Sequence, residues 1–195
     1  MKYPEEAYQK IKNNLPNDLC LVAVSKTHPV EAIKKLYDIG VRDFGENKVQ
    51  ELSQKVPLMP SDTRWHMIGH LQRNKVKQVL PLVHLIHSVD SPRLYRELLK
   101  ESEKQQTEVG ILFQIHIAQE ESKYGFSPEA FREFIQKEVL FDHPYIKPRG
   151  LMGMASLTED NARVESEFAF LKQLFEETKP QAGSEWKELS MGMSQ

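Results

Sequence analysis

The sequence predicts an α/β protein built on a parallel β-sheet, and three features of the chain support this. Seven short runs of apolar or β-branched residues recur along its 195 residues, longer amphipathic stretches separate them, and the connections are short. This alternation is typical of βα units rather than of hairpins. Seven units indicate a (β/α)8 barrel whose eighth strand is missing from the chain, although an open doubly wound sheet would produce much of the same alternation.

The elements follow in order after an opening helix at about residues 4–14, which has Ala7 and Ile11 on one side. We expect strands at residues 19–25, 41–44, 64–68, 83–88, 110–117, 149–154 and 187–191. We expect helices between them at residues 29–39, 47–56, 73–80, 92–104, 128–137 and 159–178. Ser91-Pro92 and Ser127-Pro128 each place a hydroxyl before a proline, which suits the start of a helix.

The helix at residues 159–178 is expected to pack on the outside of the sheet. Phe168, Leu171 and Phe175 recur at spacings of three and four and form an apolar stripe. Glu167 is among the charged residues that this pattern leaves for solvent.

Size and composition describe one small domain, residues 1–195, without the features of nucleic-acid or membrane binding. The 26 basic and 28 acidic residues are mixed along the chain and give a net charge of -2, so no long-range field attracts a polyanion. No apolar run approaches the roughly 20 residues that span a bilayer. The single cysteine, Cys20, excludes an internal disulfide and a thiolate metal cluster and indicates a reducing cytoplasm.

Lys26 is the first candidate for chemistry, because it stands where the first strand ends. Period-two alternation places Val22, Val24 and Lys26 on one face. Barrels bind ligands at the carboxyl ends of their strands, and we expect Lys26 to be partly buried there, which would favour the uncharged, nucleophilic amine. On position alone, the alternative is a snorkelling lysine whose stem covers the strand end.

Asn47 offers an amide at the same rim, because it follows Gly45-Glu46 at the end of the second strand. An amide there could orient a ring hydroxyl, while the alternative is a helix-capping asparagine after a turn glycine. Residues 121–127 follow the fifth strand and form a loop at this rim, which either covers a ligand or is an ordinary solvated loop.

The histidines do not predict a metal site. His66 and His70 are four residues apart, but their segment is expected to be strand and turn and offers no third ligand. His84 and His87 alternate across the fourth strand and are interpreted as core or surface imidazoles.

Small residues follow the last two strands, at residues 150–154 and 190–194. Backbone amides and hydroxyls in such turns can cradle a phosphate, and barrels often place phosphate sites after strands seven and eight. Ser190 is therefore a candidate phosphate ligand. Met152 and Met191, taken alone, suit adaptable core filler.

Five motifs occur in a fixed order from residue 19 to the end of the chain. They are Ala23-Val24-Ser25-Lys26-Thr27, Phe44-Gly45-Glu46-Asn47, the run Trp-His-Met-Ile-Gly-His-Leu-Gln-Arg-Asn-Lys at residues 65–75, His87-Ser88-Val89-Asp90 and Leu189-Ser190-Met191-Gly192-Met193-Ser194. Together they resemble the pyridoxal phosphate homeostasis protein family, also called the YggS/PROSC family.

The resemblance implies a barrel similar to the amino-terminal domain of alanine racemase, with pyridoxal 5'-phosphate held as a Schiff base on Lys26. It implies that Asn47 lies near the cofactor ring and that Ser190 and Met191 lie near its phosphate. Met152 is assigned to the same cofactor site.

The resemblance also implies a role in intracellular pyridoxal phosphate homeostasis. We expect a cytoplasmic monomer that supports the supply of the cofactor to dependent apoenzymes, and no catalytic residue, because no second catalytic acid or base accompanies Lys26. Family members continue into a further phosphate loop and strand, so we expect residues 1–195 to be a C-terminally incomplete domain. Two alternatives stay open. One is a pyridoxal phosphate-dependent racemase or decarboxylase, and the other is a Schiff-base aldolase that uses Lys26 without a cofactor.

Overall fold

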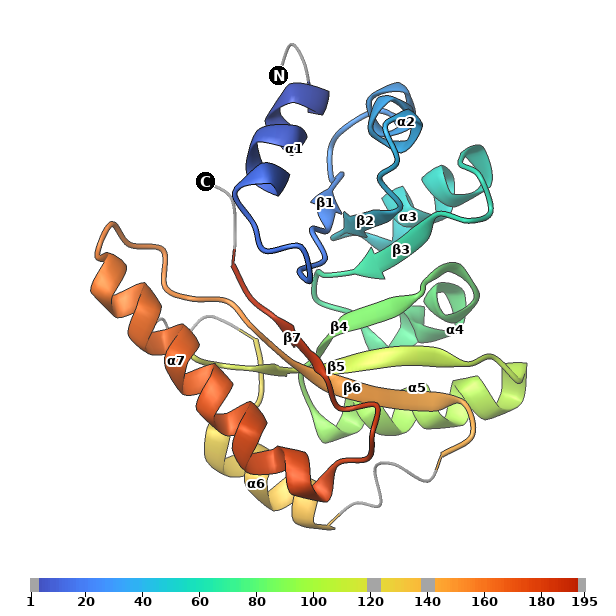
Figure 1. The fold of residues 1–195 in the computed structure, drawn as a ribbon. Helices are drawn as coiled ribbons and strands as arrows, with labels where there is room; N and C mark the ends of the chain where they lie inside the picture. The colour runs from blue at the N-terminus through green and yellow to red at the C-terminus, as the bar shows by residue number, and fades with distance from the viewer. Residues whose placement is uncertain (1–3, 119–123, 138–142, 193–195) are drawn as a thin grey trace.

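The sheet is a single layer of parallel strands that follow one another in chain order (Figure 1). The structure is a computed structural model that describes residues 4–118, 124–137 and 143–192. In these ranges seven strands form the sheet, each hydrogen-bonded to the next in parallel. They are β1 (Ala23–Val24), β2 (Asp43–Glu46), β3 (Arg64–Met67), β4 (Leu85–Val89), β5 (Val109–Ile115), β6 (Ile146–Gly153) and β7 (Glu188–Ser190).

Helices precede β1 and connect each strand to the next. They are α1 (Pro4–Asn13), α2 (Val30–Asp38), α3 (Val49–Lys55), α4 (Val76–Val79), α5 (Pro92–Gln105), α6 (Pro128–Lys137) and α7 (Asn161–Thr178). Short 3-10 turns extend several of them: η1 (Val56–Leu58), η2 (Arg73–Lys75), η3 (Leu80–Leu82) and η4 (Lys179–Gln181). The strand–helix alternation predicted from the sequence is confirmed.

Side-chain caps explain where two of the helices begin. Ser91 Oγ accepts a hydrogen bond from the Leu94 amide ahead of Pro92, which caps α5 as predicted. Asp160 caps α7 in the same way by accepting from the Arg163 amide.

The main hydrophobic core lies between the sheet and the helices. Its centre is the fully buried ring of Phe113 on β5, which contacts the rings of Tyr95, Phe131, Phe134 and Trp186. Two smaller clusters lie apart from this core. One includes Phe44, Leu52 and Trp65, and the other, which we call the inner cluster, consists of Leu85, Leu112 and Met152.

The sheet curls strongly about its own inner face. Ser190 on β7 lies 2.9 Å from His87 on β4, although β5 and β6 separate these strands in the sheet order. A flat sheet would hold strands three places apart at roughly 14 Å, at about 4.8 Å per step. The described strands therefore form an open half-barrel, which agrees with the predicted (β/α)8 type and not with a doubly wound sheet.

Three local expectations are wrong. The strand expected at residues 19–25 is reduced to Ala23–Val24, and the helix expected at residues 73–80 is a four-residue α4 between two 3-10 turns, ended near Pro81. Glu167 is buried instead of exposed, because its carboxylate accepts hydrogen bonds from the backbone amide and the hydroxyl of Ser156.

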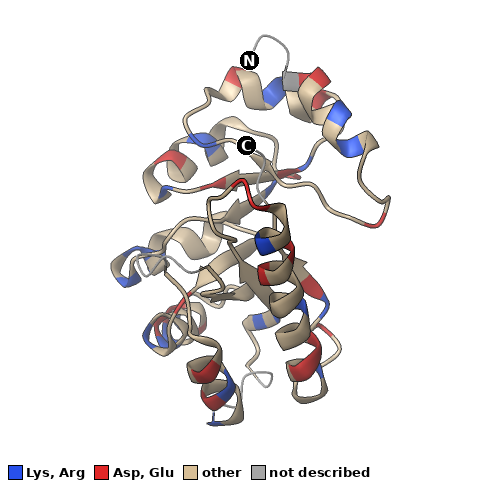
Figure 2. Cartoon of the chain, turned by 90° about the vertical axis from the view of Figure 1, so that its left-hand side faces the viewer, with Lys and Arg blue, Asp and Glu red and all other residues tan. Residues whose placement is uncertain are grey.

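Basic and acidic residues are interspersed along the helices (Figure 2). This agrees with the mixed charge of the sequence and its small net value of -2. In the part of the chain that is described, no helix is long and apolar enough to cross a bilayer.

Candidate functional site

Lys26 lies two residues beyond β1, at the carboxyl edge of the sheet. The Ser25 amide donates to the Gly45 carbonyl of β2 at 2.9 Å, which continues the parallel pairing up to the residue before Lys26. The Lys26 side chain is exposed, so the expected partial burial is wrong. Val24 is 46% exposed. It lies on β1, the first strand of the sheet, which pairs with β2 alone among the described strands.

A buried ion pair holds the backbone immediately before Lys26. Lys55 Nζ donates to Glu46 Oε1 at 2.7 Å and to the Ser25 carbonyl at 2.8 Å. The Ser25 hydroxyl donates to the same Glu46 oxygen at 2.7 Å. Glu46 is fully buried, so this carboxylate depends on these donors for its stability.

The residue after Lys26 is held by a second carboxylate. The Thr27 amide donates to Glu51 Oε2 at 2.8 Å, and this bond lowers the pKa of Glu51. Thr27 has a φ of 65°, in the left-handed region that residues other than glycine rarely adopt. The backbone turn at Lys26 is therefore held in place from both ends.

Asn47 follows β2 and is half-buried next to Gly69. A Cβ atom on Gly69 would lie 2.3 Å from the Asn47 carbonyl oxygen, so only glycine fits this close approach. The alternative of a capping Asn47 is wrong, because the residue before α3 is Lys48. A hollow of about 310 Å³ opens beside Asn47, with His70 and Lys75 among its lining residues.

A chain of four polar side chains, Asp43, His66, His87 and Ser190, crosses the interior of the half-barrel. We call it the interior chain. Asp43 Oδ1 lies 3.1 Å from His66 Nε2, His66 Nδ1 lies 2.8 Å from His87 Nε2, and His87 Nδ1 lies 2.9 Å from Ser190 Oγ. Both histidines are 4% exposed.

The two ends of the interior chain have opposite electrostatic character. Burial acts to raise the pKa of Asp43, but hydrogen bonds from His66 and Arg64 outweigh it, and the net pKa lies well below the usual value. Burial, with the neighbouring His66, lowers the pKa of His87 to about 3. Asp43 is therefore a carboxylate and His87 a neutral imidazole at neutral pH.

The two methionines assigned to the site differ in environment. Met152 is buried in the inner cluster and pairs with Ser190 across the β6–β7 ladder. Met191 is 40% exposed and precedes Gly192, which has a φ of 90° and open space where a side chain would be. The backbone at Gly192, two residues after Ser190, thus has free room beside it.

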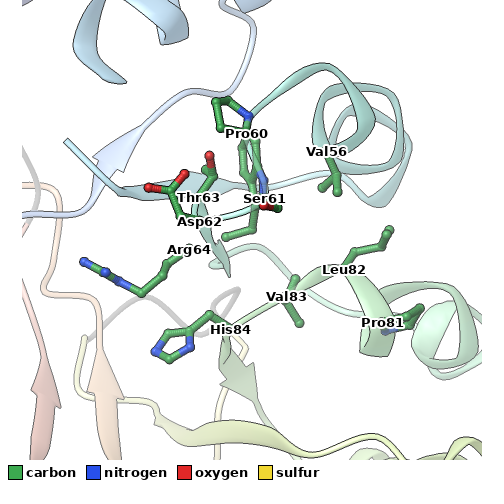
Figure 3. Close-up of a pocket in the computed structure, with 11 residues that line it drawn as sticks. Val56, Pro60, Ser61, Asp62, Thr63, Arg64, Pro81, Leu82, Val83 and His84 are labelled. Carbon is green, nitrogen blue, oxygen red and sulfur yellow. The ribbon is translucent and has the colours of Figure 1, made fainter. Parts of the chain in front are cut away.

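A larger hollow of about 510 Å³ lies at the opposite edge of the sheet, where β3 and β4 begin (Figure 3). Arg64 and His84 lie on one side of it, and Val56 and Leu82 lie on the other. Parallel α/β folds bind ligands at the carboxyl ends of their strands. We therefore place the candidate site at the Lys26 edge and not in this hollow.

Comparison with known proteins identifies the family. A family model described as alanine racemase, N-terminal domain, matches residues 5–195. The pyridoxal phosphate homeostasis protein of Aquifex aeolicus is 36% identical over 175 residues, which cover 89% of this chain and 76% of that protein. The protein of the same name from Helicobacter pylori strain 26695 is 39% identical over 176 residues, covering 89% of this chain and 77% of that protein.

The chain belongs to the pyridoxal phosphate homeostasis protein family.

Solved structures agree with this family and its fold. PipY of Synechococcus elongatus without PLP superposes with a TM-score of 0.90 at 33% identity, over 97% of this chain and 88% of that chain. The same protein with PLP bound gives a TM-score of 0.85. Alanine racemase of Clostridium difficile gives 0.78 at 14% identity, over 98% of this chain and 50% of that chain, which shows the shared fold alone. Family membership and the racemase-type fold are thus confirmed, and the family is named for homeostasis rather than for a reaction.

Several residues at this edge escaped sequence reasoning. The pair of Glu46 and Lys55 was not predicted. Lys55 follows Glu46 by nine positions and lies at the end of α3, the helix after β2. His66 and His87 contact each other across neighbouring strands. The interpretation of His87 as a core or surface imidazole is confirmed for the core, but its polar partners were not predicted. The sequence does place these two histidines on adjacent predicted strands. Alternation alone does not determine the register between the strands, so it does not show that the two rings meet.

His66 and His70 lie in different surroundings. His66 and His70 do not share a partner, because His70 Nδ1 contacts Asp90 at 2.9 Å. Among the described residues no group of three or more histidine, cysteine or acidic side chains is arranged to hold a metal ion. Of the loop at residues 121–127, residues 121–123 lie outside the described ranges, and Tyr124 stacks on the His70 ring at 3.8 Å. Ser194 also lies outside them.

Proposed function

We propose that this protein binds pyridoxal 5'-phosphate covalently through Lys26 and takes part in the homeostasis of that cofactor. The observation that carries the proposal is the position of Lys26: an exposed amine at the carboxyl edge of the sheet, on backbone anchored by a buried ion pair. The relatives' shared name and the PLP-bound structure of PipY support it.

The residues at this edge suit the chemistry of the cofactor. The Lys26 amine would hold the cofactor by condensing with its aldehyde, with water as the leaving group. Asn47 would orient the ring with its amide, beside the narrow contact with Gly69. Ser190 would bind the phosphate with its hydroxyl, Met191 would contribute its backbone, and Met152 would close the inner wall of the site.

We further propose that the role is carriage and not turnover. The carboxylates nearest the Lys26 backbone are already engaged, since Glu46 binds Lys55 and Ser25, and Glu51 binds Thr27. Neither is placed as a free general acid or base. The protein would act as a cytoplasmic monomer that passes the cofactor to apoenzymes.

The attachment point is tested by trapping. Purified protein is mixed with pyridoxal phosphate, reduced with borohydride, digested and analysed by mass spectrometry. We expect a pyridoxyl adduct on Lys26 and its loss, together with the near-visible absorbance, in Lys26→Ala. Lys34→Ala, which removes an exposed lysine on α2, is the control and should retain both signals. Unchanged absorbance in Lys26→Ala would exclude Lys26 as the attachment point.

The same material separates the carrier from the enzyme alternatives. Loaded protein is incubated with single amino acid enantiomers in deuterated water, and α-proton exchange is compared with that in Lys26→Ala. Exchange, inversion or carbon dioxide release at enzyme-like rates would establish a racemase or decarboxylase and overturn the carrier proposal. A trapped sugar adduct on Lys26 without pyridoxyl mass would instead support an aldolase.

A further inference from the structure

The hydrogen bonds of the interior chain all donate in one direction, and the carboxylate of Asp43 at one end determines that direction. Asp43 is ionised and can only accept hydrogen bonds, so a neutral His66 carries its proton on Nε2. His66 Nδ1 then accepts from His87 Nε2, and His87 Nδ1 in turn accepts from the Ser190 hydroxyl. In this state the hydroxyl proton of Ser190 points inward, toward His87.

A phosphate dianion needs the opposite direction. Its oxygens only accept hydrogen bonds, so Ser190 must turn its proton outward to bind one. His87 Nδ1 would then face the Ser190 oxygen at 2.9 Å and must supply the proton itself. That in turn requires His87 Nε2 to accept from His66 Nδ1, 2.8 Å away.

One added proton achieves this reversal. When both ring nitrogens of His66 carry protons, Nε2 still donates to Asp43 while Nδ1 donates to His87. The neutral His87 then changes tautomer, from a proton on Nε2 to a proton on Nδ1. No atom needs to move beyond the hydrogens, because each of the three contacts already has hydrogen-bond length.

The charges around the chain come from four strands and the segment before β1. Asp43 pairs with Arg64 on one side of the chain, Glu188 pairs with Arg149, and the His84 ring lies 5.9 Å from the His66 ring. Cys20 adds no charge, because burial and the neighbouring Asp43 raise its pKa to about 11. The carboxylate in direct contact with His66 is Asp43.

We propose that the interior chain couples phosphate binding at Ser190 to the uptake of one proton by His66, with His87 as the relay that reverses its tautomer. His66 and His87 are thus positioning residues that act through the Ser190 hydroxyl. The inference rests on the proposed function for the identity of its ligand, pyridoxal 5'-phosphate. The direction of the chain in the free protein does not depend on that ligand.

The decisive experiment reads the tautomers directly in the wild-type protein. Protein labelled with nitrogen-15 histidine is observed by long-range proton–nitrogen correlation at about pH 8, free and loaded with pyridoxal phosphate. We expect His87 to carry its proton on Nε2 in the free protein and on Nδ1 in the loaded protein, with both His66 nitrogens protonated after loading. A His87 that keeps its Nε2 proton while absorbance shows a bound cofactor would overturn the proposal.

Acidification of the free protein tests the same chain without any cofactor. In any state in which both His66 nitrogens carry protons, His87 should show the same tautomer change. If no cofactor binds at all, the proposed function and the coupling to it fail, but this titration still decides whether His87 relays the protonation of His66 to Ser190. An acid titration in which His66 becomes doubly protonated and His87 does not change would refute the relay.

Proton uptake on binding is measured by calorimetry in buffers of different ionisation enthalpy. Above about pH 7 the free phosphate is a dianion, so pyridoxal phosphate should take up about one proton more than pyridoxal, which lacks the phosphate. The affinity for pyridoxal phosphate relative to pyridoxal should fall by up to tenfold per pH unit as the pH rises. Ser190→Ala and His87→Gln should abolish the difference, whereas His143→Gln, at a histidine bonded to Glu103, should retain it. Equal uptake for the two ligands in the wild type would contradict the coupling.

Discussion

At the scale of single residues, the most consequential contact is the ion pair between Lys55 and Glu46. Both side chains are buried, and Lys55 reaches the Ser25 carbonyl as well as the Glu46 carboxylate. Removing one member of a buried pair leaves an uncompensated charge, which costs far more than loss of an exposed pair. The pair therefore serves both stability and the placement of Lys26.

We predict that Lys55→Met destabilises the protein by about 3 kcal/mol, because the Glu46 carboxylate is left buried without its cation. The double variant with Glu46→Gln should recover part of this loss. Urea unfolding monitored by circular dichroism measures both.

Lys137→Met is the matched control, since it breaks a pair with Glu133 in which both side chains are more than 70% exposed. We expect a change near zero for this variant. A similar loss in both lysine variants would show that burial does not determine the strength of the pair at Lys55.

At the scale of secondary structure, the β6–β7 pairing depends on one glycine. Gly150 has a φ of 151°, and a Cβ atom there would lie 1.8 Å from the Glu188 carbonyl oxygen on β7. Glu188 is the residue that pairs with Gly150, two positions before Ser190. A side chain at residue 150 would push β7, and with it the Ser190 hydroxyl, away from the sheet.

We predict that Gly150→Ala costs several kcal/mol of stability, at the upper end of single-substitution effects, and exposes the β7 amides to solvent. Hydrogen exchange at residues 188–190 and thermal unfolding measure these two effects. Gly183→Ala, where an added Cβ meets nothing within 4 Å, should leave both unchanged. Retention of slow exchange in Gly150→Ala would show that β7 tolerates the displacement.

The sequence predicted the existence of the elements better than their extents. Helix α6 spans the predicted residues, because a serine–proline start and a regular apolar stripe specify it locally. Strand β1 is shorter than its apolar run, since pairing depends on a neighbour and not on residue type. Strand β6 begins three residues earlier than predicted and includes Pro148. Proline within a sheet is expected only on edge strands or at bulges. A shift in register between β5 and β6 at this point accommodates it.

At the scale of the whole molecule, the site depends on curvature that no local pattern reveals. The positions of Lys26 and Asn47 at one edge of the sheet could be predicted, because each follows the end of a strand and these two strands are adjacent. The contact of His87 with Ser190 could not, since it joins strands three places apart and requires the sheet to curl. Burial of Lys26 was predicted wrongly for a related reason: exposure at a strand end depends on what covers the edge.

The buried imidazole of His87 makes the molecule sensitive to acid. Its folded-state pKa of about 3 is below the ordinary value of 6.5, so below about pH 6.5 the unfolded chain binds a proton that His87 does not bind in the fold. Stability is therefore present at neutral pH and falls as the pH decreases toward 3. The lowered pKa of Asp43 acts in the same direction below its ordinary value of 3.8.

We predict that His87 contributes a loss of about 1 kcal/mol of unfolding free energy per pH unit below about pH 6. Urea unfolding at several pH values, compared between wild type and His87→Gln, isolates this contribution. The variant should show a shallower dependence on pH. Parallel curves for the two proteins would mean that His87 gains its proton equally in the folded and unfolded states.

The agreement between strand order and chain order also governs how the molecule assembles. Each strand adds to the edge formed by its predecessor, so a nascent chain can build the sheet one unit at a time from its amino end. The contact between His87 and Ser190 joins residues 103 positions apart and closes among the last, because long loops close at the greatest entropic cost. A chain interrupted during synthesis therefore displays the Lys26 amine before the Ser190 hydroxyl is in place.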